Sequence, residues 1–287
     1  MSLLATLLLS VALPPDLRAE REPGVPYDPF DGQSADARMR VFAEGVPPGA
    51  ILTAEPAAGA PLVFTAPGAV LPYRLATGDG PNAGANTGPD DRVSVPLTAA
   101  ADESAEAEIR LLVDPGPVVP PGSYEAGLDF RLLAEDGTIL TELLDVTAAI
   151  NVPARAQAII AGTSGAFDPQ ASVAFVDFGT LETGETRQLF VSVRANTSAV
   201  VTITSENGGV MTLRGDAAAS APDAPGAAYS VDLDGTVSDL ATPLSVVRAP
   251  PVTAQGAAYP MTITIGAVEQ LFAGTYRDDL TIEVRPQ

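Results

Sequence analysis

The sequence predicts an all-β protein made of two tandem immunoglobulin-like β-sandwich domains, and three observations favour this fold class. Apolar and polar residues alternate in many short runs, glycine and proline punctuate the runs, and one set of sequence blocks occurs twice. Alternation with a period of two places apolar side chains on one face of a strand. The chain of 287 residues contains 26 Gly and 27 Pro, which favours turns over long helices.

Six runs show the alternation, and they are rich in Val, Ile and Thr, whose branched side chains suit a pleated strand. These runs are residues 39–43, 108–113, 190–194, 201–204, 261–265 and 280–284. Turn sequences such as Asp136-Gly137, Asn207-Gly208-Gly209 and Asp234-Gly235 lie between them. Many short strands separated in this way predict a sandwich or a barrel.

An internal repeat predicts that one β-domain is present in two copies. Residues 122–130 (GSYEAGLDF) match residues 274–282 (GTYRDDLTI) at an offset of 152. Three further pairs of blocks follow the same order: 109–113 with 261–265, 71–75 with 227–231, and the strand at Val41 with the strand at Val191. The repeat predicts domains at residues 24–152 and 153–287, joined near residues 153–155.

The composition excludes much enzyme chemistry. The chain has no Cys, His, Trp or Lys. It contains 15 basic residues, all Arg, and 36 acidic residues, which give a net charge of −21. Without these residues there is no imidazole base, thiol nucleophile, Cys/His zinc site, Schiff-base lysine or Walker-type phosphate loop. The negative charge also disfavours nucleic acid and anionic membranes as partners. We expect a protein that is not an enzyme.

The carboxylates suggest no site. Residues 78–91 contain Asp, Asn and Gly that could suit calcium, but their spacing matches no known calcium loop, so a mobile loop is favoured and calcium binding stays open. The acidic run 102–108 is interpreted as a solvated strand face, and Asp28 and Asp31 have no evident partner. Asp278 and Asp279 are adjacent, so on a strand they face opposite sides. We assign no catalytic, cofactor-binding or metal residue and expect no cofactor.

The first residues are interpreted as a signal peptide spanning residues 1–20, with an incomplete start. Residues 1–13 (MSLLATLLLSVAL) form a compact apolar run, followed by Pro14-Pro15 and a polar stretch. The run is too short to cross a bilayer as a helix, so no membrane span is expected in the mature form. A positive start is missing, and a site after Ala19 is poor because Leu17 stands where a small residue should. An apolar terminus without such a role is the alternative.

Three blocks of the second half resemble the spore coat U domain family, which includes pilins of archaic chaperone–usher fimbriae. The blocks are Phe178-Gly179, the Tyr229 strand followed by Asp234-Gly235, and the closing run 273–284 (AGTYRDDLTIEV). The resemblance implies an exported subunit, in the periplasm in transit and then at the cell surface, whose partners are a periplasmic chaperone, an outer-membrane usher and a neighbouring pilin. Family domains commonly contain a disulfide, which a chain without cysteine cannot form.

The two predicted domains differ after their last shared strand. Residues 138–146 follow the turn Asp136-Gly137 and could pair back on residues 130–133, so we expect a complete first domain. The given sequence stops three residues beyond the predicted strand 280–284, so we expect the second domain to be open and to need a donor strand. Residues 20–33 offer only Val25, Tyr27 and Phe30 between prolines and make a poor donor. A subunit that accepts but does not donate belongs at the tip of a fibre.

Two classes of function follow. The favoured one is a structural and adhesive fimbrial subunit at the tip that is assembled by donor-strand complementation. The alternative is a self-contained periplasmic or surface module that binds a carbohydrate or a cation; a carboxylate hydrolase is a third. The family resemblance also implies that the first domain, residues 24–152, is the candidate binding domain. It would attach to an abiotic or host surface through apolar loops, here residues 47–52, 66–71 and 116–120, whose alternative role is ordinary turns. No receptor is predicted.

Overall fold

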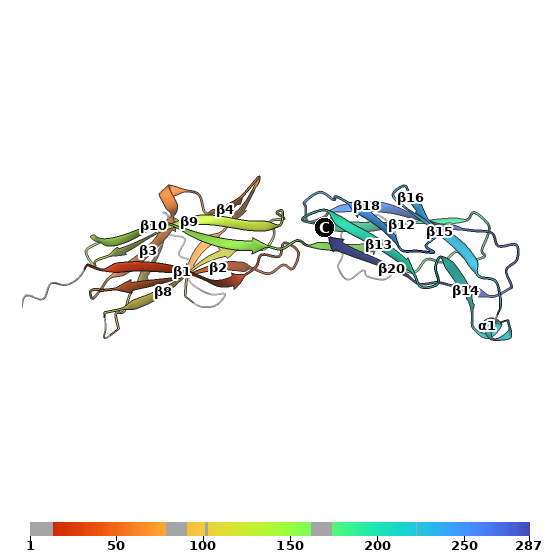
Figure 1. The fold of residues 1–287 in the computed structure, drawn as a ribbon, viewed down its shortest axis with the longest axis horizontal. Coiled ribbons are helices and arrows are strands. Elements are labelled where there is room, and N and C mark those ends of the chain that lie inside the picture. The colour runs from red at the N-terminus through yellow and green to blue at the C-terminus, as the bar shows by residue number, and fades with distance from the viewer. Residues whose placement is uncertain (1–13, 79–90, 101–102, 162–173, 222) are drawn as a thin grey trace, which may run out of the picture. The chain divides into compact units, whose positions relative to one another are not determined.

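The computed structural model describes residues 14–78, 91–100, 103–161, 174–221 and 223–287, and it is an all-β protein, as predicted (Figure 1). The exceptions to strand and loop are a 3-10 turn (Ala57–Gly59) and the short helix α1 (Asp216–Ser220) among these residues. The chain divides into two compact units, residues 1–117 with 122–153 and residues 118–121 with 154–287. None of the described helices has the length and apolar character needed to cross a bilayer.

The first unit is a sandwich of two antiparallel sheets. One sheet has the order β1-β2-β8-β6; the other has the order β5-β4-β9-β3-β7, with β10 paired to β9. The strands are β1 (Asp16–Val25), β2 (Ala35–Glu44), β3 (Ile51–Pro56), β4 (Val63–Ala66), β5 (Ala69–Pro72), β6 (Arg74–Thr77), β7 (Val93–Pro96), β8 (Ala105–Val113), β9 (Gly122–Leu133) and β10 (Ile139–Val152). The set β1, β2, β8, β6 against β10, β9, β3 is the ABED and GFC arrangement of an immunoglobulin-like sandwich.

The alternating runs build the core between the two sheets. Met39 and Val41 of β2, Ile109 and Leu111 of β8, and Leu128, Phe130 and Leu132 of β9 are all at most 1% exposed. The hairpin expected after Asp136-Gly137 is present, because β10 pairs with β9 from Ile139 opposite Leu133 to Val152 opposite Gly122. The first unit therefore contains its own last strand.

The first unit begins earlier than the sequence analysis placed it. Strand β1 starts at Asp16, upstream of the expected start at residue 24 and inside the expected leader of residues 1–20. It pairs with β2 from Asp16 opposite Glu44 onward. The alternation is too short to predict this strand from the sequence, because only Leu17 and Ala19 are apolar at its inward positions before Arg21 and Pro23 interrupt the pattern.

A buried ion pair was also missed. Asp36 of β2 is 2% exposed and accepts hydrogen bonds from Arg110 Nε of β8 at 2.8 Å and from the backbone N–H of Val25 at 2.9 Å. Burial tends to raise the pKa of Asp36, but the hydrogen bonds from Val25, Arg110 and Arg38 outweigh it and hold the pKa below its ordinary value. Arg110 stood at a polar position of an alternating run, so its burial could not be read from the pattern.

The second unit repeats the sandwich with one sheet of order β11-β12-β18-β15-β14-β19, in which β16 pairs with β15, and one of order β17-β13-β20. Its strands are β11 (Ala156–Ala161), β12 (Thr186–Ala195), β13 (Ala199–Ser205), β14 (Val210–Arg214), β15 (Ala227–Leu233), β16 (Thr236–Ser238), β17 (Leu244–Arg248), β18 (Ala257–Ile265), β19 (Thr275–Arg277) and β20 (Leu280–Pro286). Its core gathers Val191, Val201, Ile203, Val231 and Ile263.

The sequence repeat is also a structural repeat. Strands β11, β12, β13, β15, β18 and β20 occupy the places that β1, β2, β3, β6, β8 and β9 occupy in the first unit. Leu75 of β6 pairs with Leu111 of β8, and Val231 of β15 pairs with Ile263 of β18. Among the described residues no strand of the second unit corresponds to β10.

Candidate functional site

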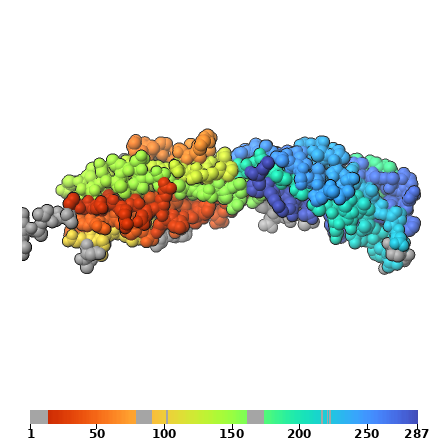
Figure 2. All heavy atoms as spheres, in the orientation of Figure 1, coloured from red at the N-terminus to blue at the C-terminus, as the bar shows by residue number. Residues whose placement is uncertain are grey.

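The free edge of β20 is the feature that distinguishes the second unit from the first. Strand β20 pairs with β13 over seven consecutive residues, from Leu280 opposite Ser205 to Pro286 opposite Ala199, without a bulge. On its other side no strand of the described residues pairs with it. In the space-filling view the dark-blue atoms of β20 lie at the surface of the second unit (Figure 2). We call this unpaired side of the strand the β20 edge.

The side chains along the β20 edge are incompletely covered. Leu280, Ile282 and Val284 pack against the core but stay partly exposed, whereas the alternate residues Thr281, Glu283 and Arg285 are exposed to solvent. Their repeat partners Leu128, Phe130 and Leu132 in β9 are 0% exposed. In the first unit β10 pairs with β9 and completes its sheet. The side chains at these three repeat positions are thus buried in the first unit and partly exposed in the second.

Strand β11 lies next to this opening. It pairs only with β12 among the described residues, and it contacts β20 without strand pairing. Ala156, Ala158 and Ile160 of β11 are partly buried against the same core. Two unpaired strand edges, one from each sheet, therefore lie beside each other, and the apolar residues between them are only partly covered.

Other edges carry features that discourage strand addition. Strand β10 has a register shift between Leu143 and Val146, where Asp145 adopts a positive φ of 55°. Strand β17 has five residues and is preceded by Pro243 and followed by Pro250. The β20 edge has neither a bulge nor an interior proline, so it keeps the regular geometry that an added strand requires.

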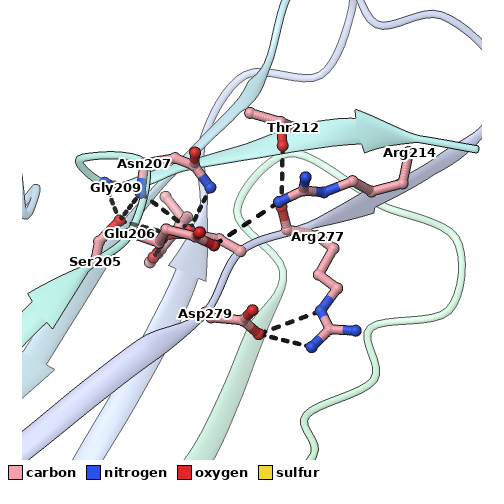
Figure 3. Close-up of polar contacts among 10 residues, drawn as sticks. Ser205, Glu206, Asn207, Gly209, Thr212, Arg214, Arg277 and Asp279 are labelled. Carbon is pink, nitrogen blue, oxygen red and sulfur yellow. Dashed lines mark hydrogen bonds and ion pairs between the residues drawn. The ribbon is translucent and has the colours of Figure 1, made fainter. Parts of the chain in front are cut away.

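A polar cluster fixes the start of β20. Asp278, between β19 and β20, accepts hydrogen bonds from Ser205 Oγ at 2.5 Å, from Asn207 Nδ2 at 2.7 Å and from the Tyr229 hydroxyl. Ser205 Oγ also accepts from the N–H of Gly209 at 2.7 Å. Figure 3 shows Ser205, Asn207 and Gly209 gathered at the turn between β13 and β14. The cluster ties this turn to the point where β20 begins.

The charges of this cluster are set by its hydrogen bonds. Burial tends to raise the pKa of Asp278, but the hydrogen bonds from Ser205, Tyr229 and Asn207 together hold the pKa below its ordinary value. Burial and the hydrogen bond to Asp278 raise the pKa of Tyr229. A charged carboxylate that accepts four hydrogen bonds, from Ser205, Asn207 and Tyr229, acts as a structural anchor in the second unit.

The closing block of the repeat is held by backbone contacts and close packing. The Tyr276 hydroxyl accepts from the N–H of Phe272 at 3.0 Å and donates to the Phe272 carbonyl at 3.2 Å. A Cβ on Gly274 would lie 2.4 Å from Leu213 Cδ1, so glycine is required for this packing. At Gly122 no atom lies within 4 Å of an added Cβ, and the requirement for glycine comes from the backbone φ of 153° instead.

The apolar side chains of the loops considered for attachment are mostly buried. Ala50 and Leu52 are 1% exposed and Leu71 is 0% exposed, whereas Val70 at the β4–β5 turn is 56% exposed. In residues 116–120 Val119 is buried. Attachment through these loops is therefore limited to single exposed side chains such as Val70.

Among the described residues the carboxylates considered above do not gather at one point. Residues 79–90 of the considered calcium loop, and Asp102 of the acidic run, lie outside the described residues. Glu106 pairs with Arg40 at 3.3 Å, and Asp28 and Asp31 each accept from a backbone N–H two residues on. Asp279 pairs with Arg277 at 2.9 Å (Figure 3). In the described part of the chain no group of three acidic residues could hold a metal ion.

Several solved structures are similar to this chain. The chaperone–tip subunit complex CsuC–CsuE of archaic pili from Acinetobacter baumannii shares 15% identity at a TM-score of 0.44, covering 82% of this chain and 84% of that one. The CupB6 tip adhesin of Pseudomonas aeruginosa shares 11% at 0.33, covering 95% and 96%. A chaperone–tip adhesin complex of CFA/I fimbriae shares 14% at 0.34, covering 97% and 81%.

No protein-family model and no curated protein matches the chain. At the identities above the likeness concerns the fold, so membership of the spore coat U family stays a prediction.

Proposed function

We propose that this chain is an exported structural and adhesive subunit of a chaperone–usher fimbria whose second unit accepts a strand from a partner at the β20 edge. The observation that carries the proposal is the contrast between Leu280, Ile282 and Val284, which are partly exposed, and Leu128, Phe130 and Leu132, which are buried. Apolar side chains beside a regular unpaired edge favour strand addition, in which main-chain hydrogen bonds and alternating side chains both contribute.

The partners proposed for this edge are a periplasmic chaperone first and a neighbouring pilin subunit later, with an outer-membrane usher directing the exchange. The net charge of −21 supports a partner other than nucleic acid. The chain passes through the periplasm and acts at the cell surface, where it contacts an abiotic or host surface.

The proposed position at the tip rests on the N-terminal segment. Tyr27 is 0% exposed, donates its hydroxyl hydrogen bond to the Pro117 carbonyl at 2.6 Å, and donates its backbone N–H to Asn151 at 3.0 Å. Phe30 is 9% exposed in the same unit. Two of the three large apolar residues of segment 20–33 are therefore packed in their own unit, which makes this segment unsuited to donation.

The test is to supply the missing strand within the chain. A copy of residues 134–146, which form the turn after β9 and the first part of β10, is appended after Gln287. We expect the added strand to raise the free energy of unfolding of the second unit by more than about 1 kcal/mol. Because about 1 kcal/mol corresponds to roughly 4 °C at this size, the unfolding midpoint of the second unit should rise by about 5 °C or more. The matched control carries Asp in place of the residues copied from Leu143 and Val146, and it should leave the midpoint unchanged.

Two results would contradict the proposal. An equal midpoint in the grafted and control chains would show that the β20 edge does not take a strand. Full protection of the β20 amides in the ungrafted chain, measured by hydrogen exchange, would show that the second unit is already complete, as expected for a self-contained module.

A further inference from the structure

The turn between β13 and β14 contains the one Asn-Gly pair of the sequence. Asparagine stands at positions 82, 86, 151, 196 and 207, and only Asn207 precedes a glycine. Gly208 has no side chain to shield its backbone nitrogen, and its φ of 66° lies in the left-handed region that glycine adopts readily. Attack of this nitrogen on the side-chain amide of the preceding asparagine is the first step of deamidation, so Asn207 carries the sequence context that this reaction needs.

In the folded chain the Asn207 amide is held by Asp278. Its Nδ2 donates to Asp278 Oδ1 at 2.7 Å, and the backbone N–H of Asn207 donates to the same oxygen at 3.2 Å. The amide is thus held on the side of its own backbone nitrogen. Ring closure needs the Cγ of Asn207 against the nitrogen of Gly208, on the other side of the residue, so the contact with Asp278 must break first.

We propose that Asn207 is a site of spontaneous deamidation, controlled by its contact with Asp278, whose product weakens the start of β20. The Gly208 nitrogen bonds to Asn207 Cγ and loses its proton, and Nδ2 leaves as ammonia, which gives a cyclic succinimide. Water then opens either carbonyl of this ring, giving aspartate or isoaspartate at position 207. Water is the sole co-reactant. The inference goes beyond the proposed function, since it holds whether or not the β20 edge takes a strand.

The product places a second carboxylate against Asp278. Aspartate at position 207 has no side-chain donor and faces the Asp278 carboxylate where the hydrogen bond now lies. The arginines at this turn are paired with other carboxylates, Arg214 with Glu206 at 3.9 Å and Arg277 with Asp279 at 2.9 Å (Figure 3). Because like charges this close repel, deamidation weakens the cluster that fixes the start of β20.

The first experiment follows the modification in the folded full chain at neutral pH over days, by peptide mapping that separates asparagine, aspartate and isoaspartate. We expect conversion at Asn207, with Asn151 and Asn196 intact as internal controls, because β-branched residues follow them and obstruct ring closure. Asp278→Ala should speed the conversion by about tenfold or more, since it removes a hydrogen bond to a charged acceptor. The control Val231→Ala, which destabilises the core of the same unit, should leave the rate close to that of the parent chain.

Two outcomes of this experiment would overturn the proposal. An Asn207 that stays intact as long as Asn151 would show that the turn does not permit ring closure. Equal acceleration by Asp278→Ala and Val231→Ala would show that conversion requires unfolding of the whole unit and that the contact with Asp278 does not control it.

A second measurement tests the effect of the product and leaves Asp278 in place. Asn207→Asp reproduces the aspartate product, and the matched control Asn207→Ala removes the same amide without adding charge. We expect the second unit to unfold at a midpoint roughly 4 °C or more lower in Asn207→Asp than in Asn207→Ala. Equal midpoints would refute the weakening at the start of β20. Strand acceptance is decided separately by the grafted chain, so a failure of either idea can be told apart from a failure of the other.

Discussion

The hydroxyl of Tyr229 in β15 donates a hydrogen bond to the carboxylate of Asp278, which lies 49 residues further along the chain, between β19 and β20. Each residue belongs to a block of the repeat, but nothing in the sequence indicated that the two blocks meet. Through this contact the strand at the centre of the larger sheet fixes the point where β20 enters the smaller one.

The first prediction concerns this anchor. Asp278→Ala leaves the Tyr229 hydroxyl, Ser205 and Asn207 without their acceptor, and we expect it to lower the free energy of unfolding of the second unit by about 2 kcal/mol or more. Asp279→Ala removes an exposed pair with Arg277 and should cost about 0.5 kcal/mol or less. Denaturant unfolding of the two variants gives the comparison. Equal losses would show that Asp278 is not an anchor.

The second prediction is a loss of stability in acid. The pKa of Asp278 is lowered in the folded chain from its ordinary value of 3.8, so its contribution is fully present above that value and is lost as the pH falls through the folded pKa. We expect the second unit to lose stability from about pH 5 downward, and Asp278→Asn to flatten that dependence. Hydrogen exchange read by mass spectrometry follows each unit separately. An unchanged acid slope in the variant would contradict the assignment.

A matched pair of leucines tests the opening at the β20 edge. Leu128→Ala removes a fully buried side chain and should cost about 2–5 kcal/mol, whereas Leu280→Ala at the same position of the repeat should cost about 1 kcal/mol. In the chain with the grafted strand the cost of Leu280→Ala should rise towards that of Leu128→Ala. If the two leucines cost the same in the ungrafted chain, the second unit is closed at this position.

The two repeat glycines give the fourth prediction. Gly274→Ala introduces a Cβ that would lie 2.4 Å from Leu213 Cδ1, so Leu213 and its surroundings must shift. Gly122→Ala meets no neighbour within 4 Å and incurs only the cost of its backbone conformation, about 1 kcal/mol. We therefore expect the larger loss of thermal stability at Gly274. The reverse order, measured by calorimetry, would show that the contact with Leu213 relaxes without cost.

The sequence by itself determined the all-β class, the pairs of repeated strands and the presence of a hairpin after Asp136-Gly137. These features depend on local patterns, because alternation and turn residues act within a few positions and a repeat needs only self-comparison. The sequence did not reveal β1, whose inward positions after Ala19 are Arg21 and Pro23, or the burial of Arg110 against Asp36. Both depend on which strand lies opposite, and strand pairing across 74 residues is not a local property.

Only the tertiary structure decided which apolar positions are covered. Leu128 and Leu280 stand at the same place in matching blocks, and no local rule separates them. Their difference arises because β10 pairs with β9 in the first unit, while among the described residues no strand pairs with the outer side of β20. A side chain is buried by its neighbours in space, and those neighbours are set by the sheet order.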